Sequence, residues 1–138
     1  MSIRDTFSSQ KNIEPDQYQR NIVDCFDNFQ KEIINEKKII DKVISFFRDK
    51  QPISKGIYLW GNVGRGKTFL MDLFYDTLSI ADKNTKHFHR LMEEIHDGIC
   101  RFKDHQDPIS KVAESMSKKY SVLCIDEFYV EDIADATI

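Results

Sequence analysis

The chain has 138 residues, a formal net charge of −3 and 41% hydrophobic residues, which suits one modest globular domain with a packed core. The slightly acidic charge argues against a dedicated polyanion-binding protein, so we see no strong nucleic-acid signal. Its three cysteines lack C-x-x-C spacing and indicate neither a disulfide framework nor a zinc knuckle. Without a secretory signal or an apolar run long enough to span a bilayer, the sequence predicts a cytoplasmic protein with no integral membrane segment.

The first part of the chain carries no recognisable chemistry. Residues 1–13 are polar and lack a period, which predicts a flexible N-terminal arm. Apolar residues then recur at helical spacing over residues 15–34 and again over residues 39–47. These two stripes predict two helices with ordinary core-facing sides.

The next stretch matches the phosphate-binding P-loop pattern G-x-x-x-x-G-K-[ST]. Residues 56–60 before it predict a buried strand, and residues 69–78 after it predict a helix, which is the context that the motif requires. Glycines let the backbone wrap around an anion, and a helix N-terminus directs N–H groups at phosphates. We therefore expect ATP to contact Gly61, Asn62, Val63, Gly64, Arg65, Gly66, Lys67 and Thr68.

Three side chains of this loop have separate expected roles. Lys67 would reach the β- and γ-phosphates as a catalytic positive charge, and the Thr68 hydroxyl would bind Mg²⁺. Arg65 could touch phosphate or could be a solvated loop residue, and the sequence leaves both interpretations open.

Strands and helices alternate through the rest of the chain. Residues 79–85 predict a loop, residues 86–90 a strand and residues 91–102 a helix. Asp107 and Pro108 are typical of a helix start, and that helix should end near Lys119. The apolar run over residues 121–127 ends in two carboxylates, which is the Walker B pattern. This alternation predicts an α/β fold with a parallel sheet and flanking helices.

The two carboxylates, Asp126 and Glu127, should lie near the P-loop, because ligands of parallel sheets bind at the carboxyl ends of the strands. Asp126 would hold Mg²⁺, usually through water. Glu127 would polarise the attacking water as a general base. An extra carboxylate beside the metal-binding acid favours nucleotide hydrolysis over phosphoryl transfer to a small molecule.

Three histidines permit a second interpretation. His87 and His89 would share one face of a strand, and His96 follows two helical turns later. Such residues can build a metal site, but histidines satisfied by neighbours are commoner, and neither a cysteine nor a third acid is arranged to complete a site. The stretch could also contact a partner or a polynucleotide.

Taken together, these motifs resemble the ZapE-type cell-division ATPases and their mitochondrial Afg and Lace relatives. The resemblance rests on residues 15–19, 56–68, 71–75, 86–92 with His96, and 123–128, and it runs from about residue 14 to the end of the chain. It implies an AAA+-like P-loop NTPase fold, Mg²⁺-dependent ATP hydrolysis, a division-ring protein as partner and a homo-oligomer in the full-length form. Asn62 departs from the family's usual Gly or Asp, at a variable loop position.

Family members run far past Walker B, whereas this sequence stops at Ile138. We therefore expect residues 14–138 to be the N-terminal half of a P-loop ATPase domain, truncated after the Walker B strand. The resemblance implies that a sensor residue and an arginine finger lie in the other half, so this chain alone should lack full activity. Two alternatives stay open: a helicase-loader or nucleic-acid-associated ATPase, and an interaction protein whose nucleotide site is vestigial.

Overall fold

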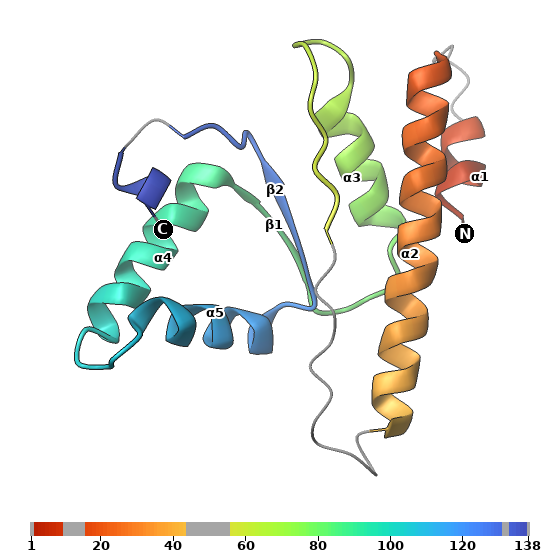
Figure 1. The fold of residues 1–138 in the computed structure, drawn as a ribbon. Helices are drawn as coiled ribbons and strands as arrows, with labels where there is room; N and C mark the ends of the chain where they lie inside the picture. The colour runs from red at the N-terminus through yellow and green to blue at the C-terminus, as the bar shows by residue number, and fades with distance from the viewer. Residues whose placement is uncertain (1, 10–15, 44–55, 131–132, 138) are drawn as a thin grey trace. The chain divides into compact units, whose positions relative to one another are not determined.

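The computed structural model of the chain describes residues 2–9, 16–43, 56–130 and 133–137. It is mixed α/β and divides into two compact units, Met1–Ser79 and Ile80–Ile138. The first unit contains α1 (Ile3–Ser8), α2 (Gln17–Val43) and α3 (Lys67–Thr77) (Figure 1). The second unit contains β1 (Lys83–His87), α4 (Phe88–Arg101), α5 (Pro108–Lys119), β2 (Val122–Asp126) and the short 3-10 helix η1 (Asp135–Thr137).

Helix α1 lies where the sequence predicted a flexible arm, so that prediction is wrong for residues 3–8. Ser2 and Asp5 form a capping box, in which the Ser2 hydroxyl accepts from Arg4 N and the Asp5 carboxylate accepts from Ser2 N. Ile3 and Phe7 are one helical turn apart and both are buried. The Phe7 ring lies 6.4 Å from that of Phe69 in α3. A local cap and two apolar anchors therefore order this segment.

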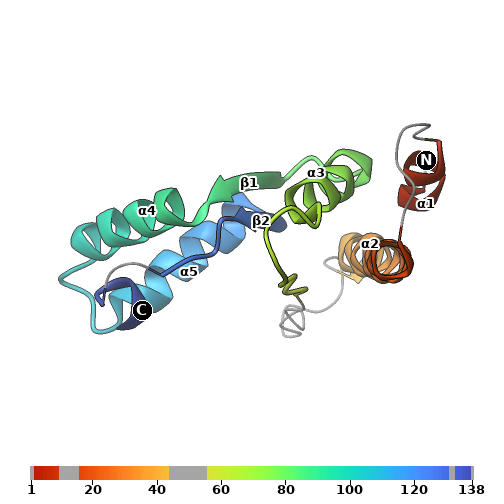
Figure 2. The same cartoon turned by 90° about the horizontal axis from the view of Figure 1, so that it is seen from above.

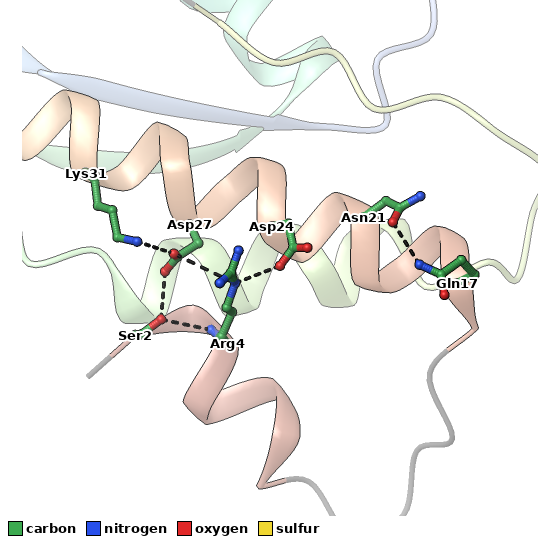
Figure 3. Close-up of polar contacts among 7 residues, drawn as sticks. All are labelled: Ser2, Arg4, Gln17, Asn21, Asp24, Asp27 and Lys31. Carbon is green, nitrogen blue, oxygen red and sulfur yellow. Dashed lines mark hydrogen bonds and ion pairs between the residues drawn. The ribbon is translucent and has the colours of Figure 1, made fainter.

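A buried carboxylate on α2 joins α1 to α2 (Figure 3). Asp27 is only 3% exposed, and it accepts hydrogen bonds from Ser2 Oγ at 2.7 Å and from Lys31 Nζ at 2.6 Å. Arg4 lies between Asp27 and the exposed Asp24, with its Nε 2.7 Å from the Asp24 carboxylate. The Lys31 and Ser2 hydrogen bonds lower the pKa of Asp27, so the residue is held in its charged form.

Helix α2 is one helix where the sequence predicted two. No glycine or proline separates the two apolar stripes, so the helix continues through Val43; predicted residues 44–47 lie outside the described part. Phe26 packs on Phe74 of α3 at 5.0 Å between ring centroids. The buried Gln30 donates to the Phe74 carbonyl and to the Thr77 hydroxyl. Polar and apolar contacts thus fix α3 on α2.

Residues 56–60 are not a strand, so the predicted buried strand before the P-loop is wrong for this structure. Three of its side chains are exposed, at 37% for Ile57, 70% for Tyr58 and 80% for Trp60. A buried strand needs neighbours that pair its backbone groups. In the part of the chain that the structure describes, the sheet consists of β1 and β2 alone. The predicted helix after the loop is confirmed as α3.

The second unit contains the predicted parallel pairing. β1 and β2 lie side by side (Figure 2), with Lys83 opposite Val122 and His87 opposite Asp126. The Walker B strand is confirmed as β2. The strand predicted over residues 86–90 lies instead at residues 83–87, so residues 83–85 of the predicted loop belong to β1. This strand ends before residue 88, because Phe88, Leu91 and Met92 are buried along one face of α4, and the helix predicted from residue 91 starts at Phe88.

Helices α4 and α5 connect the two strands and pack closely on each other. α5 begins at Pro108 and ends at Lys119 as predicted, and Asp107 accepts from Ser110 N as its N-cap. Gly98 of α4 is buried against Val112 of α5, where an added Cβ would lie 2.6 Å from a Val112 methyl group. This close approach positions the crossover that makes β1 and β2 parallel.

Candidate functional site

The P-loop residues form a turn that leads directly into α3. Gly64 and Gly66 have φ values of 79° and 77°, in the left-handed region that side chains with a Cβ rarely adopt. Gly66 is the N-cap residue of α3 and has no side chain with which to cap the first N–H groups. The loop therefore has the backbone conformation, and the uncapped helix start, that suit an anion.

Lys67 folds back over this loop. Its Nζ donates to the carbonyl oxygens of Gly61 and Asn62, at 2.8 Å each. The ammonium group is therefore held at the loop whose N–H groups would surround the phosphates. Thr68 is exposed at the second position of α3, where a hydroxyl can reach a cation beside a bound nucleotide.

Arg65 contacts the start of α2. Its Nη2 lies 2.8 Å from Asp16 Oδ2, and its carbonyl accepts from Gln19 Nε2 at 3.4 Å. The sequence left open whether this guanidinium touches phosphate or solvent, and in the structure it pairs with Asp16. The sequence indicates a helix start over residues 15–19, but it does not indicate that Asp16 of this helix start pairs with Arg65.

Asp126 and Glu127 lie at the carboxyl end of β2, as the sequence predicted. Asp126 is the last residue of the strand and is partly buried. Its Oδ1 accepts from Glu127 N at 2.9 Å. Glu127 has a φ of 52°, uncommon for a residue with a side chain and typical of functional sites. The Glu127 side chain is 73% exposed, so it is open to water.

The side chain of Glu127 lies beside that of His87. His87 ends β1, and its Nδ1 lies 3.5 Å from Glu127 Oε2. The sequence drew attention to this histidine without giving it this role. His87 and His89 do not share a strand face as predicted, because His89 belongs to the first turn of α4. His96 pairs instead with Asp135, at 2.8 Å.

The predicted site residues fall into two groups. Residues 61–68 belong to the first unit, and Asp126 and Glu127 belong to the second. Within residues 2–9, 16–43, 56–130 and 133–137, no group of three or more His, Cys, Asp or Glu side chains could hold a metal ion. No helix in those ranges has the length and apolar character needed to cross a bilayer.

Comparison with known proteins supports one family. The model of a family described as AFG1-like ATPase matches residues 5–138. The cell division protein ZapE of Escherichia coli K12 is 45% identical over 84 residues, which is 61% of this chain and 22% of that protein. The lactation elevated protein 1 homolog B of Danio rerio is 40% identical over 95 residues, 61% of this chain and 19% of that protein. The chain spans about a fifth of the length of these relatives. No solved structure gives a significant match.

Proposed function

Because the chain belongs to the AFG1-like ATPase family, we propose that it binds ATP with Mg²⁺ at the loop of residues 61–68. The observation that carries the proposal is the loop itself: left-handed glycines, an uncapped helix start and the Lys67 ammonium group come together over eight residues. Each of these three features favours a phosphate chain, through backbone N–H donors and one fixed positive charge.

Each side chain has a distinct proposed role. Lys67 exchanges its carbonyl partners for β- and γ-phosphate oxygens. Thr68 and Asp126 would supply oxygen ligands to Mg²⁺, which would neutralise charge on the phosphates. Glu127 accepts a proton from a water molecule whose oxygen attacks the γ-phosphorus, and ADP leaves. The exposure of the Glu127 side chain supports this role, since a general base must contact water. His87 Nδ1, 3.5 Å from Glu127 Oε2, is close enough to orient that carboxylate.

The similarity to ZapE, which is named a cell division protein, supports a proposal for the biological setting. We propose that the protein is a homo-oligomer that works in the cytoplasm and associates with a division-ring protein. The sequence features that oppose a dedicated polyanion-binding protein favour this setting over a nucleic-acid-associated ATPase.

We also propose that the 138-residue chain alone turns ATP over slowly. Hydrolysis needs Lys67 and Asp126 at a fixed separation, and a displacement of about 1 Å can cost roughly a hundredfold. Residues 56–60 lead into the loop and form no strand, so strand pairing does not fix the backbone that precedes Lys67.

Binding measurements on two acid variants test these roles. Glu127→Gln should keep the Mg·ATP affinity of the parent, because the amide is nearly isosteric and only proton transfer is lost. Asp126→Asn should weaken binding in the presence of Mg²⁺ but not in EDTA. Titration of both variants with a fluorescent ATP analogue gives the comparison. Loss of Mg²⁺-dependent affinity in Glu127→Gln, with none in Asp126→Asn, would show that the roles are reversed.

A further inference from the structure

The two residues that cap α2 each make a second bond, and both second bonds go to Arg65. Asp16 Oδ1 accepts from Gln19 N at 2.8 Å, and Gln19 Oε1 accepts from Asp16 N at 3.3 Å, so the pair forms a capping box. The remaining atoms, Asp16 Oδ2 and Gln19 Nε2, bind the Arg65 side chain and the Arg65 carbonyl. One P-loop residue is therefore held at both ends by one helix start.

We propose that Asp16 and Gln19 are positioning residues of the nucleotide loop, which hold it in its phosphate-binding conformation before the nucleotide arrives. The inference rests on the proposed function of that loop. We call the contacts of Arg65 with Asp16 and Gln19 the loop clamp. The loop clamp joins two capping residues of α2, Asp16 and Gln19, to Arg65, which lies almost fifty positions later in the chain.

The loop needs such a restraint because of its glycines. Arg65 lies between Gly64 and Gly66, both left-handed, and glycine has more conformational freedom to lose than any other residue. Gln19 also approaches Gly66 itself, where an added Cβ would lie 3.5 Å from Gln19 Nε2. Fixing the loop beforehand removes part of the ordering cost of binding.

The geometry also determines what Arg65 contributes. Its side chain is 56% exposed and that of Asp16 is 39% exposed, so water screens the pair. Exposed ion pairs contribute about 0.2–1 kcal/mol, and breaking this one should change nucleotide affinity by no more than about fivefold. The clamp is thus expected to adjust the affinity of the loop, while the Lys67 charge makes the larger contribution to that affinity.

Two substitutions each weaken one contact of the clamp and keep the helix cap. Asp16→Asn retains a good N-cap side chain but loses the charge that pairs with Arg65. Gln19→Glu retains the acceptor of the capping box but places a carboxylate oxygen against the Arg65 carbonyl. Glu114→Gln is the control, because on α5 it breaks exposed ion pairs with Lys118, at 2.7 Å, and with Lys111, at 3.0 Å.

The first measurement is amide hydrogen exchange in the nucleotide-free chain. We expect Asp16→Asn and Gln19→Glu to speed exchange at residues 62–66 by about twofold to fivefold. Glu114→Gln should leave these amides unchanged. Equal exchange in all four proteins would overturn the proposal, whatever the nucleotide affinity.

The second measurement is the affinity for a fluorescent Mg·ATP analogue. Asp16→Asn should weaken binding about twofold to fivefold in the parent, and by much less when Arg65 is already replaced by Gln, because the clamp acts through that residue. Tighter binding in Asp16→Asn would mean that Asp16 only withholds Arg65 from phosphate, and the proposal would be wrong. A parent that binds no nucleotide but shows the exchange effect would refute the proposed function and leave the clamp standing.

Discussion

The buried carboxylate of Asp27 gives the sharpest stability prediction. Replacing it by Asn keeps its size but removes its charge. The Ser2 hydroxyl then donates to a neutral amide oxygen, and a hydrogen bond to a charged group is worth about 1 kcal/mol more than one to a neutral group. The Lys31 and Arg4 side chains are 64% and 51% exposed, so the ion pair of each with Asp27 contributes only about 0.5 kcal/mol after screening. Relief from burying a charge offsets part of these losses. We expect Asp27→Asn to lower the free energy of unfolding by about 1–2 kcal/mol.

The assay is urea unfolding followed by far-UV circular dichroism, with Asp24→Asn as the matched control. Asp24 lies one helical turn earlier and pairs with the same Arg4, but its side chain is 54% exposed (Figure 3). Its loss should cost no more than about 1 kcal/mol. Equal losses in the two variants would refute the argument that burial makes Asp27 the stronger contact.

The pH dependence provides a second check on Asp27. Its pKa is lowered in the folded chain by the bonds from Lys31 and Ser2. The stabilisation is therefore present above the ordinary aspartate pKa of about 4 and is lost as the pH falls through the lower folded value. The difference between parent and Asp27→Asn should stay constant from about pH 5 to 7 and shrink below about pH 4.

Two further predictions concern the second unit and catalysis. Gly98→Ala should lower the free energy of unfolding by about 1 kcal/mol in urea titrations. Overpacking against Val112 costs about 1–3 kcal/mol, and the higher helix propensity of Ala offsets about 1 kcal/mol of that cost. Adding Val112→Ala should then cost less than it does in the parent, and strict additivity would contradict the steric cause. Steady turnover of Mg·ATP by the 138-residue chain should be close to that of a Lys67→Ala control; Lys67-dependent turnover of about 1 s⁻¹, within the range of typical enzymes, would contradict the expected low activity.

The sequence predicted the elements whose signals are local. α5 begins and ends as expected, because Asp107 caps it and Pro108 occupies its first turn. β2 follows from a run of four apolar residues before Asp126, and α3 follows from the P-loop motif and its helical spacing. The capping box of Ser2 and Asp5 is also a local signal. Helix α1 was not predicted from the sequence, because the prediction relied on the polar composition of residues 1–13 and not on this capping pattern.

The rest depended on contacts between distant residues. β1 has the sequence Lys-Asn-Thr-Lys-His, which has no apolar alternation, and it is a strand because it pairs with β2. Residues 56–60 have strong strand propensity but form no strand in this structure. The pairing of Arg65 with Asp16 joins residues 49 positions apart, and no local sequence pattern predicts it. Backbone pairing and long-range ion pairs therefore limit what the pattern alone predicts.

The most direct test of the nucleotide site is calorimetric titration of the chain with Mg·ATP, beside Lys67→Ala and a surface control, Lys103→Ala. We expect one binding site in the parent, unchanged affinity in Lys103→Ala, and affinity at least about tenfold weaker in Lys67→Ala, since a lost contact to a charged group costs about 1.5–3 kcal/mol. No binding by the folded parent, or equal affinities in the parent and Lys67→Ala, would contradict the assignment of residues 61–68 as the phosphate-binding loop.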